Sequence, residues 1–567
     1  MSDTEPTGNG SDGGSALRRY GPLVAILAVV AVVGAALVLS SGDDDDDTAR
    51  GDTAAGGENT GTSAPETTEA AESADSGETV DTADGAEPDP DVDTGSWGET
   101  TLADLPEGVV PWRLAAAEGV TDQYEWGDRC DTVTGTLLMA GIAPSECFAV
   151  YDGDNGGASD IGITGDTVTI VLYQGPDDDI ILKSVYDQIG NDDTNAQELE
   201  TVQSFVEYYQ AYLETYGRRL EVISYEGTGS AVDATAARAD AAAIAEDLQP
   251  FMVFGGPVLT PAFAEELATR EVPCFACTPP QSDRFYEENF PYIWDIAKYS
   301  EQGQQHVAAY VGDRLAGRPA EHAGDEQYHG TERVFGTIRV LTGPESQYTH
   351  DQFVDRLADH DVSLAEDQTF ADPVIDLPSK AATIIAKMKE AGVTSVIYAG
   401  DPLAPQILTA EATKQGYFPE WILTGSALVD TTIFARTYDQ EQWSNAFGIS
   451  NLVARQPKEQ AGAYFIHECF TGEPAAADQT AGILIAAPAV VFPLLQQVGP
   501  NLTREAVTEV FSDVPPLNED YITTYQISFG EQDIFDGFDM AAFDDTTEIW
   551  WDAETVGPDE LGQEAPG

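Results

Sequence analysis

The stretch FMVFGGPVLTPAFAEELATREVPCFACTPP, residues 251–280, contains the pattern that decides the fold. It begins with a short apolar run that ends in glycine, as expected of a fully buried strand. Residues 260–270 then show a helical spacing of apolar residues, and 272–276 form a second apolar run before a Thr-Pro-Pro turn. A strand, a helix and a strand in this order are typical of a parallel βαβ unit with a right-handed crossover.

The same alternation continues on both sides of this stretch. The predicted strands are 167–173, 219–225, 334–341, 393–399 and 420–424, and the predicted helices are 198–216, 233–247, 351–360, 377–392 and 402–415. The alternation forms two runs, at about 166–297 and 298–449. The sequence therefore predicts an α/β protein with two doubly wound lobes, each built on a parallel sheet.

The turns that follow the predicted strands suggest where a ligand binds. Five strands end in glycine or proline turns that open a helix. In open parallel sheets, ligands bind beyond the carboxyl ends of the strands, where helix N-termini present free N–H groups. Any single turn of this kind is explained as well by chain reversal alone. Five such turns divided between two lobes favour a ligand cleft.

In this order of elements and in its turns, the chain resembles the type I periplasmic binding protein superfamily, and within it the branched-chain amino acid-type substrate-binding proteins of ABC transporters. The resemblance covers about 165–457. It is strongest in residues 225–247 (YEGTGSAVDATAARADAAAIAED), 251–280, 343–353 (GPESQYTHDQF) and 391–430 (AGVTSVIYAGDPLAPQILTAEATKQGYFPEWILTGSALVD). The segment 105–165 and the ending of the chain lie outside the pattern and look like the elaborations of actinobacterial relatives.

The resemblance implies a clamshell that closes on a small solute and delivers it to an ABC transporter permease, with no cofactor and no catalytic activity. Lobe one is expected from 166–297 and 450–515, lobe two from 298–449 and 516–555, and a tail from 556–567. The positions that match the ligand loops of the family are Gln174, Gly256, Thr278, Tyr348, Asp401 and Ser426. Of these, Thr278 is expected to donate its hydroxyl, Tyr348 to cover the ligand and Asp401 to hold an ammonium or amide.

Two departures from the family pattern bear on the ligand. Amino acid receptors of this group usually have a serine-rich loop where this chain has Gly256-Pro257-Val258, and an acidic residue where it has Ser426-Ala427. The predicted ligand is therefore a small polar solute, an amino acid, an amide or a related compound, rather than specifically a branched-chain amino acid. Asp401 either replaces the missing acid or caps the helix that starts at Pro402.

The N-terminus predicts attachment to a membrane. Arg18 and Arg19 precede an apolar run at 21–41, which is long enough to cross ~30 Å of hydrocarbon. The positive-inside rule puts residues 1–20 in the cytoplasm and the bulk of the chain outside. Residues 42–104 are rich in Asp, Glu, Gly, Thr and Ser, which predicts a disordered acidic linker. A cleavable signal peptide is the alternative, although its apolar core is usually ~7–15 residues.

The five cysteines are compatible with an oxidising compartment. A disulfide between Cys130 and Cys147 is predicted within the leader segment 105–165. Cys274 and Cys277 form a single C-x-x-C, which is a redox pair, half of a zinc site, a local disulfide or simply two buried small residues. Because no second C-x-x-C or histidine pair accompanies it, burial or pairing with Cys469 is the favoured interpretation, and no metal site is predicted.

Composition excludes several functions. The 567 residues include 25 Lys and Arg against 100 Asp and Glu, a formal net charge of −75. Residues 1–104 contain 23 acidic and 3 basic residues, so most of the negative charge belongs to the predicted folded part. Nucleic acid is excluded as the default partner because phosphate binding needs clustered basic charge. A hydrolase is disfavoured because no G-x-S-x-G, H-E-x-x-H or phosphate loop occurs. A sensor or scaffold of the same fold remains the alternative to a transport receptor.

Overall fold

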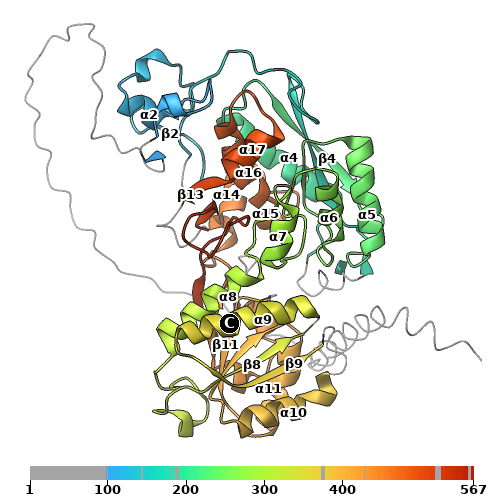
Figure 1. Cartoon of the computed structure of the whole chain (residues 1–567), viewed down its shortest axis with the longest axis vertical. Helices are drawn as coiled ribbons and strands as arrows, with labels where there is room; N and C mark the ends of the chain where they lie inside the picture. Colours follow the sequence, from blue (N-terminus) through green and yellow to red (C-terminus); the bar gives the residue numbers. More distant parts are fainter. Residues whose placement is uncertain are drawn as a thin grey trace, which may run out of the picture.

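The protein is described by a computed structural model in which two α/β lobes lie one above the other (Figure 1). The structure describes residues 97–98, 100–141, 145–180, 182, 183, 186, 191–341, 343–371, 377–426, 428–517, 525–559 and 564–566. The predicted membrane span at 21–41 and most of the predicted linker lie outside these residues.

The sheet of the first lobe is entirely parallel. In spatial order its strands are β4 (Arg219–Glu226), β3 (Thr167–Gln174), β5 (Met252–Phe254), β6 (Cys274–Phe275) and β7 (Ile293–Trp294). The central strands are buried on both faces, which explains why β5 appears in the sequence as a continuous apolar run without alternation.

Two separate passages of the chain supply the helices of this lobe. The first passage provides α4 (Asn195–Tyr212), α5 (Ala234–Ala243), α6 (Ala262–Thr269) and α7 (Asp283–Asn289), and the second provides α14 (Gly462–Thr471), α15 (Ala481–Leu484), α16 (Ala486–Val498) and α17 (Arg504–Phe511). Helix α4 begins at a capping box, in which Thr194 and Gln197 bond each other's backbone N–H groups. One hydrophobic core joins residues of both passages.

The sheet of the second lobe has the same order of parallel strands, with one antiparallel strand added at its edge. Its strands are β9 (Leu364–Phe370), β8 (Phe335–Val340), β10 (Ser395–Ala399), β11 (Glu420–Thr424), β12 (Ala446–Ser450) and the antiparallel β15 (Thr547–Trp550). Its helices are α8 (Ser300–Ala309), α9 (Pro344–Asp359), α10 (Leu377–Glu390), α11 (Ala404–Lys414), α12 (Thr432–Ala435) and α13 (Gln440–Trp443). These two parallel sheets confirm the predicted fold class.

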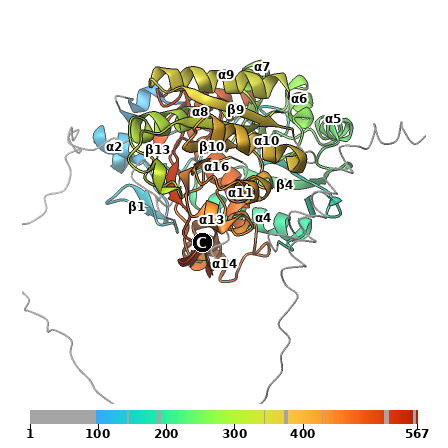
Figure 2. The same ribbon diagram turned by 90° about the horizontal axis from the view of Figure 1, so that it is seen from below.

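Helices cover both faces of the second sheet. Figure 2 shows α8 and α9 on one face and α10, α11 and α13 on the other. The alternation along β10 separates two cores, because Ile397 packs against α8 and α9 while its neighbours Val396 and Tyr398 pack against α10 and α11. The lobe is therefore a doubly wound sandwich with two hydrophobic layers.

Three segments connect the lobes, at about 295–299, 451–461 and 531–546. The third connection starts after β14, which ends at Gly530, whereas the return of the chain to lobe two was predicted at 516. The hairpin of β13 (Asp513–Leu517) and β14 (Ile527–Gly530) belongs to the first-lobe core, where Val514 and Phe529 are buried. Two consecutive prolines, Pro515 and Pro516, suggest a break in the sequence, but β13 runs through them.

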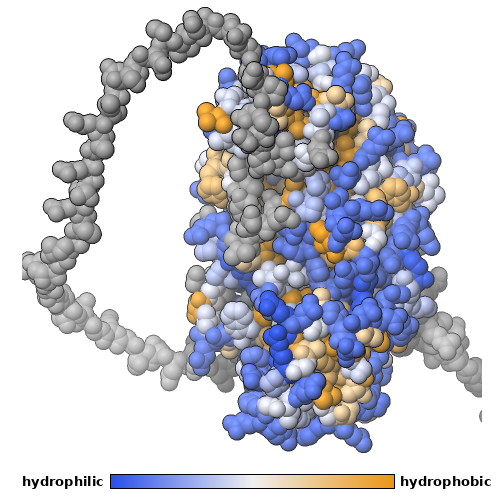
Figure 3. Space-filling model, turned by 60° about the vertical axis from the view of Figure 1, so that its left-hand side comes forward, coloured by the Kyte–Doolittle hydropathy of each residue, from blue (hydrophilic) through white to orange (hydrophobic). Residues whose placement is uncertain are grey.

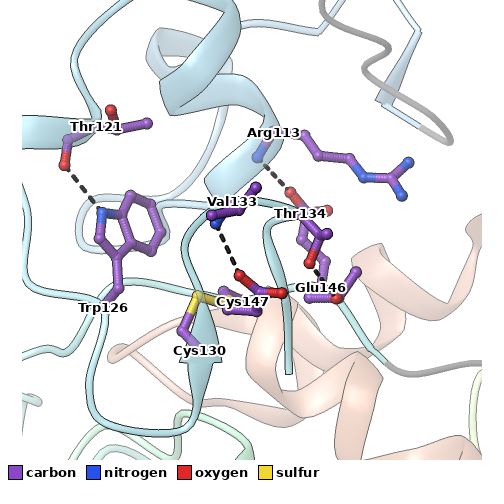
Figure 4. Close-up of a disulfide and its surroundings, with 10 residues drawn as sticks. Arg113, Thr121, Trp126, Cys130, Val133, Thr134, Glu146 and Cys147 are labelled. Carbon is purple, nitrogen blue, oxygen red and sulfur yellow. Dashed lines mark hydrogen bonds between the residues drawn. A yellow bond between two sulfur atoms is a disulfide. The ribbon is translucent and has the colours of Figure 1, made fainter. Parts of the chain in front are cut away.

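The leader segment is folded against the first lobe. It contains α2 (Trp112–Ala117) and a small hairpin, β1 (Cys130–Asp131) and β2 (Thr136–Leu137), and a disulfide joins Cys130 to Cys147 (Figure 4). The last residues of the predicted linker, 42–104, also contact this segment. The Trp97 indole N–H donates to Glu146 Oε2 at 2.7 Å. The folded part thus starts by residue 97 rather than at 105.

The C-x-x-C cysteines are both buried, as one favoured interpretation has it, but neither pairs with Cys469. Cys274 and Cys277 form a disulfide with their Cα atoms 6.0 Å apart, and Cys469 is free and exposed. Strand β6 ends at Phe275, and Ala276 has a φ of 57°, so the chain turns back and brings Cys277 towards Cys274. Only this local reversal, which the spacing does not reveal, makes the pairing possible.

The visible surface of the described residues is mainly hydrophilic (Figure 3). On the face shown in Figure 3, hydrophilic residues predominate and hydrophobic ones form small, separate groups. Within the described residues, one helical stretch, Ala481–Val498, is long and apolar enough to span a membrane by composition. It comprises α15 and α16, and 56% of it is buried inside the first lobe, as expected of a core helix.

Candidate functional site

A cavity lies at the point where the strand order of the first sheet reverses. The chain places β4 on one side of β3 and β5 on the other, so the crevice between the ends of β3 and β5 is the topological switch point. A cavity of about 270 Å³ opens there, lined by Gln174 and Gly175 at the end of β3 and by 255–258 after β5. We call it the first-lobe cavity.

The remaining walls come from α4 and from the second passage of the chain. Glu198 and Val202 of α4 line one side, and Leu484, Ala487 and Pro488 of α15 and α16 line another. The further lining residues are Leu172, Tyr173, Leu182, Tyr186, Gly229, Ala231, Phe254, Ala276, Ile296 and Ile483. The cavity is therefore mainly apolar, with few polar groups at fixed places, which is the usual composition of a small-molecule site.

Gln174 lines the cavity, but its amide is engaged with the protein. Its Nε2 donates to the carbonyl oxygen of Asn195 at 2.9 Å and to Glu198 Oε2 at 3.1 Å, and its Oε1 accepts from the Ser224 hydroxyl at 2.7 Å. Since both N–H groups and the carbonyl oxygen of the Gln174 amide are hydrogen-bonded, the side chain is held in one orientation at the cavity wall. Its main effect is to hold the carboxylate of Glu198 in place.

Glu198 is a polar residue of this wall that sequence reasoning missed. Burial raises the pKa of its carboxyl, the hydrogen bond from Gln174 lowers it, and the nearby charges of Asp193 and Asp177 raise it further. Burial and the charge of Glu198 likewise raise the pKa of Tyr186. Its only sequence signal is an acidic residue in the first turn of a helix, which is far too common a feature to select it.

Gly256 also lines the cavity, and a neighbouring turn leaves no room for a side chain at this position. A Cβ atom at this position would lie 2.2 Å from the carbonyl oxygen of Cys277. The turns after β5 and β6 can therefore approach each other only without a side chain here. Thr278 follows this turn, is half-buried, donates to the carbonyl oxygen of Pro279 at 3.1 Å and does not line the cavity.

Two of the second-lobe candidates follow neighbouring strands of the second sheet, Asp401 after β10 and Ser426 after β11. Asp401 Oδ1 accepts from the N–H groups of Leu403 at 2.8 Å and Ala404 at 3.0 Å, so one of its carboxylate oxygens bonds the turn that opens α11. The Ser426 hydroxyl lies 3.3 Å from both the N and the O of Gly400. Neither residue lines the first-lobe cavity.

Tyr348, the third second-lobe candidate, contacts the first lobe. The guanidinium of Arg284 lies 3.4 Å from the centre of its ring, and its hydroxyl is 3.5 Å from Asp283 Oδ2. Glu345, one turn earlier on α9, accepts from the Ser282 hydroxyl at 3.3 Å. Helices α7 and α9 both start beyond the carboxyl ends of strands, so these contacts show that the carboxyl ends of the two sheets face each other.

The structure thus brings Gln174 and Gly256 together at one cavity and leaves Thr278, Tyr348, Asp401 and Ser426 outside it. Among the described residues, no group of three His, Cys, Asp or Glu side chains is arranged to hold a metal ion.

In comparisons with known proteins, no protein-family model and no curated protein matches the sequence. Solved structures with a similar arrangement include a solute-binding protein of an ABC transporter from Rhodopseudomonas palustris in complex with p-hydroxybenzoic acid (12% identity, TM-score 0.47, 71% of this chain and 95% of that chain). A branched-chain amino acid transporter substrate-binding protein from Streptococcus pneumoniae in complex with isoleucine is similar at 14% identity and TM-score 0.45, over 70% of this chain and 98% of that one. A type 1 periplasmic binding protein from Bordetella pertussis has 11% identity and TM-score 0.45, over 68% and 96%.

Proposed function

We propose that this chain is an extracytoplasmic receptor that binds a small solute between its two lobes and delivers it to an ABC importer. The observation that supports this most directly is the first-lobe cavity. It lies at the switch point of a parallel sheet whose strand ends face those of the second lobe. This is where open α/β sheets bind ligands.

The connections between the lobes fit such a role. Two of the crossing segments pair with each other, where Asp295 N donates to the carbonyl oxygen of Met540 at 2.8 Å and Ala542 N donates to that of Asp295 at 3.0 Å. Crossing segments that pair in this way can form a hinge that permits rotation of the lobes while it restricts other movements. A solute that contacts both lobes binds the closed state better than the open state and shifts the population accordingly.

The free energy needed to close the lobes determines how strongly the solute must prefer the closed form. Moving the lobes from 1:99 to 99:1 closed needs a differential affinity of about 5.5 kcal/mol. A solute held only by the first-lobe cavity does not distinguish the two states. Second-lobe groups near the cleft, including Tyr348, Asp401 and Ser426, are the proposed source of the remaining contacts, and they reach the solute only after closure.

A solute screen tests the proposal. The full chain is heated with members of a library of amino acids, amides, ureas, amines and small aromatic acids, and its melting temperature is recorded. A specific solute is expected to raise the melting temperature and to reduce the distance between fluorophores placed on the two lobes. Chemical conversion of the solute by the protein, or the lack of any stabilising solute, contradicts the proposal.

The protein that binds this chain in the presence of solute distinguishes a transport function from a sensing function. A transport receptor is expected to bind its membrane permease more tightly when the solute is present, because the permease recognises the closed lobes. A receptor whose solute-dependent partner is a kinase or a cell-wall enzyme belongs to the alternative, a sensor or scaffold of the same fold.

A further inference from the structure

Among the described residues that line the first-lobe cavity, the only charged side chain is negative. Of the described residues that line it, none is Lys, Arg or His, and Glu198 is the one ionisable acid. A carboxylate ligand therefore finds no positively charged side chain in this wall, whereas an amino acid or aromatic acid needs one or several well-placed N–H donors.

Asp193 and Asp177 are near enough for their charges to raise the pKa of Glu198, and the hydrogen bonds of these two acids come from neutral groups. Asp193 Oδ2 accepts from the backbone N–H groups of Gln479 at 2.9 Å and Thr480 at 2.7 Å, and from the Thr480 hydroxyl at 2.8 Å. Asp177 Oδ1 accepts from Asn195 N at 3.0 Å. Because neutral donors satisfy these carboxylates without cancelling their charge, they add to the negative potential at the cavity.

The hydrogen bonds of Glu198 leave an acceptor for a ligand. Gln174 donates to Oε2, and no described residue donates a side-chain or backbone N–H to Oε1. Gln174, which donates to Glu198, is itself held by hydrogen bonds to Ser224 and Asn195. We therefore expect the Glu198 carboxylate to stay turned towards the cavity. A pre-positioned carboxylate in a mainly apolar wall is the kind of group that receives a hydrogen-bond donor.

We propose that the first-lobe cavity selects a small solute with an apolar body and a hydrogen-bond-donating end, an ammonium or a primary amide, and that Glu198 receives this end. The inference rests on the proposed function of the site as a receptor for a solute. The apolar side chains of Val202, Leu484 and Pro488 surround the body of the solute. The volume of about 270 Å³ lies slightly below the ~300–1,000 Å³ of usual ligand pockets, which limits the solute to a compact one.

Matched probes test this selectivity. Isoamylamine, isovaleramide and isovalerate share one branched skeleton, and benzylamine, benzamide and benzoate share one ring, so each set differs only in its polar end. Dissociation constants are measured by calorimetry on the full chain near neutral pH. The amine and the amide are expected to bind at least about tenfold more tightly than the carboxylate, as the loss of a charged hydrogen bond requires.

Two variants separate the role of Glu198 from general acidity. Glu198→Gln is expected to weaken the amine by at least about tenfold and the amide by less, because a neutral acceptor replaces a charged one. Glu200→Gln removes a charge from an exposed position on the same helix that does not line the cavity, and it is expected to leave all affinities unchanged. Unchanged melting temperatures of both variants without solute show that folding is intact.

The failures are distinguishable. If carboxylates bind as tightly as amines, or if Glu198→Gln leaves the amine affinity unchanged, the inference about the solute class is wrong while a solute-binding receptor remains supported. If no amine or amide binds but another library solute stabilises the chain, the inference is also wrong and the receptor proposal stands. If no solute of any class stabilises the chain, both proposals fail.

Discussion

The guanidinium of Arg284 lies 3.4 Å from the centre of the Tyr348 ring, so a first-lobe helix covers an aromatic side chain of the second lobe. The same guanidinium is 3.5 Å from Glu345. Both contacts cross the cleft on α7 and α9, near the ends of the two sheets. We expect them to hold the lobes together in the absence of solute and so to contribute to the proposed equilibrium between open and closed forms.

Removal of this contact is expected to open the lobes. The ion pair is largely exposed and contributes little, whereas the cation–π contact contributes about 0.5–1 kcal/mol. Arg284→Ala should therefore shift the solute-free population towards the open form by roughly two- to fivefold. Energy transfer between fluorophores on the two lobes measures the shift. Arg314→Ala, which removes an exposed pair to Glu548 within the second lobe, is the control, and equal distances in both variants contradict the prediction.

Gly256→Ala is expected to destabilise the first lobe. Its new Cβ would meet the backbone of Cys277, which cannot move as a flexible side chain does, so we expect a loss of about 1–3 kcal/mol in the free energy of unfolding. Urea denaturation measures it. Gly303→Ala is the matched control, because this glycine lies within α8 with nothing near its added Cβ, and a gain of about 0.5–1 kcal/mol is expected. Equal effects of the two substitutions would show that the close approach is unimportant.

The hinge is expected to lose stability as the pH rises. Burial raises the pKa of Asp539 to about 7, and burial together with the charge of Asp539 raises that of Asp544 to about 8. An unfolded Asp has a pKa of about 3.9, so the folded chain binds more protons between about pH 4 and 8. The free energy of unfolding must then fall with rising pH across this window, by up to about 1.4 kcal/mol per pH unit for each group. Chemical denaturation at several pH values measures the slope.

Asp544→Asn tests the source of this slope. It removes one titrating group, and the decline between about pH 4 and 8 should become shallower. Asp533→Asn alters an exposed aspartate of the same connection and should not change the slope. Burial lowers the pKa of Lys298 to about 8, which acts in the opposite direction only above that pH. A slope that is the same in all variants would exclude the buried hinge carboxylates as its cause.

The leader disulfide is expected to stabilise its segment. In the chain-entropy model, a bridge over the 17-residue separation of Cys130 and Cys147 contributes about 3 kcal/mol. Replacing both cysteines by serine should therefore make the segment around β1 and β2 more sensitive to limited proteolysis. Cys469→Ser is the control because this cysteine is free and exposed. Cleavage at the wild-type rate would show that packing against the first lobe alone holds the leader.

Much of the fold was predictable because its elements have strong local signals. The buried strand β5 and the helices α10 and α11 follow from apolar runs and periodic spacing, and the structure has them within a few residues of the predicted ranges. Strand β9 was not predicted, because it lies at the sheet edge and reads LAEDQTF, with polar residues at most positions. An edge strand needs few apolar side chains, so hydrophobic patterning does not reveal it.

The candidate site was predictable only in part. Gln174 and Gly256 belong to turns at strand ends, where the topology of a parallel sheet makes a crevice unavoidable, so their place at the cavity follows from the order of elements. Glu198 was not predictable, because its position in the wall depends on how α4 turns relative to β3 and on the hydrogen bond from a residue 24 positions away. For Asp401 the sequence allows two roles, and its bonds to the N–H groups of Leu403 and Ala404 depend on the conformation of the turn before α11.

The sequence by itself determined that strands and helices alternate, that two lobes form, and that the chain is strongly acidic with an apolar N-terminal run, because each of these depends on residues close together in the chain. Only the tertiary structure decided which cysteines pair, where the chain returns to the second lobe, and which carboxylate faces the cavity. Those features depend on contacts between distant segments, such as α4 with α15 and α16, whose packing is the sum of many weak interactions and cannot be inferred from any local pattern.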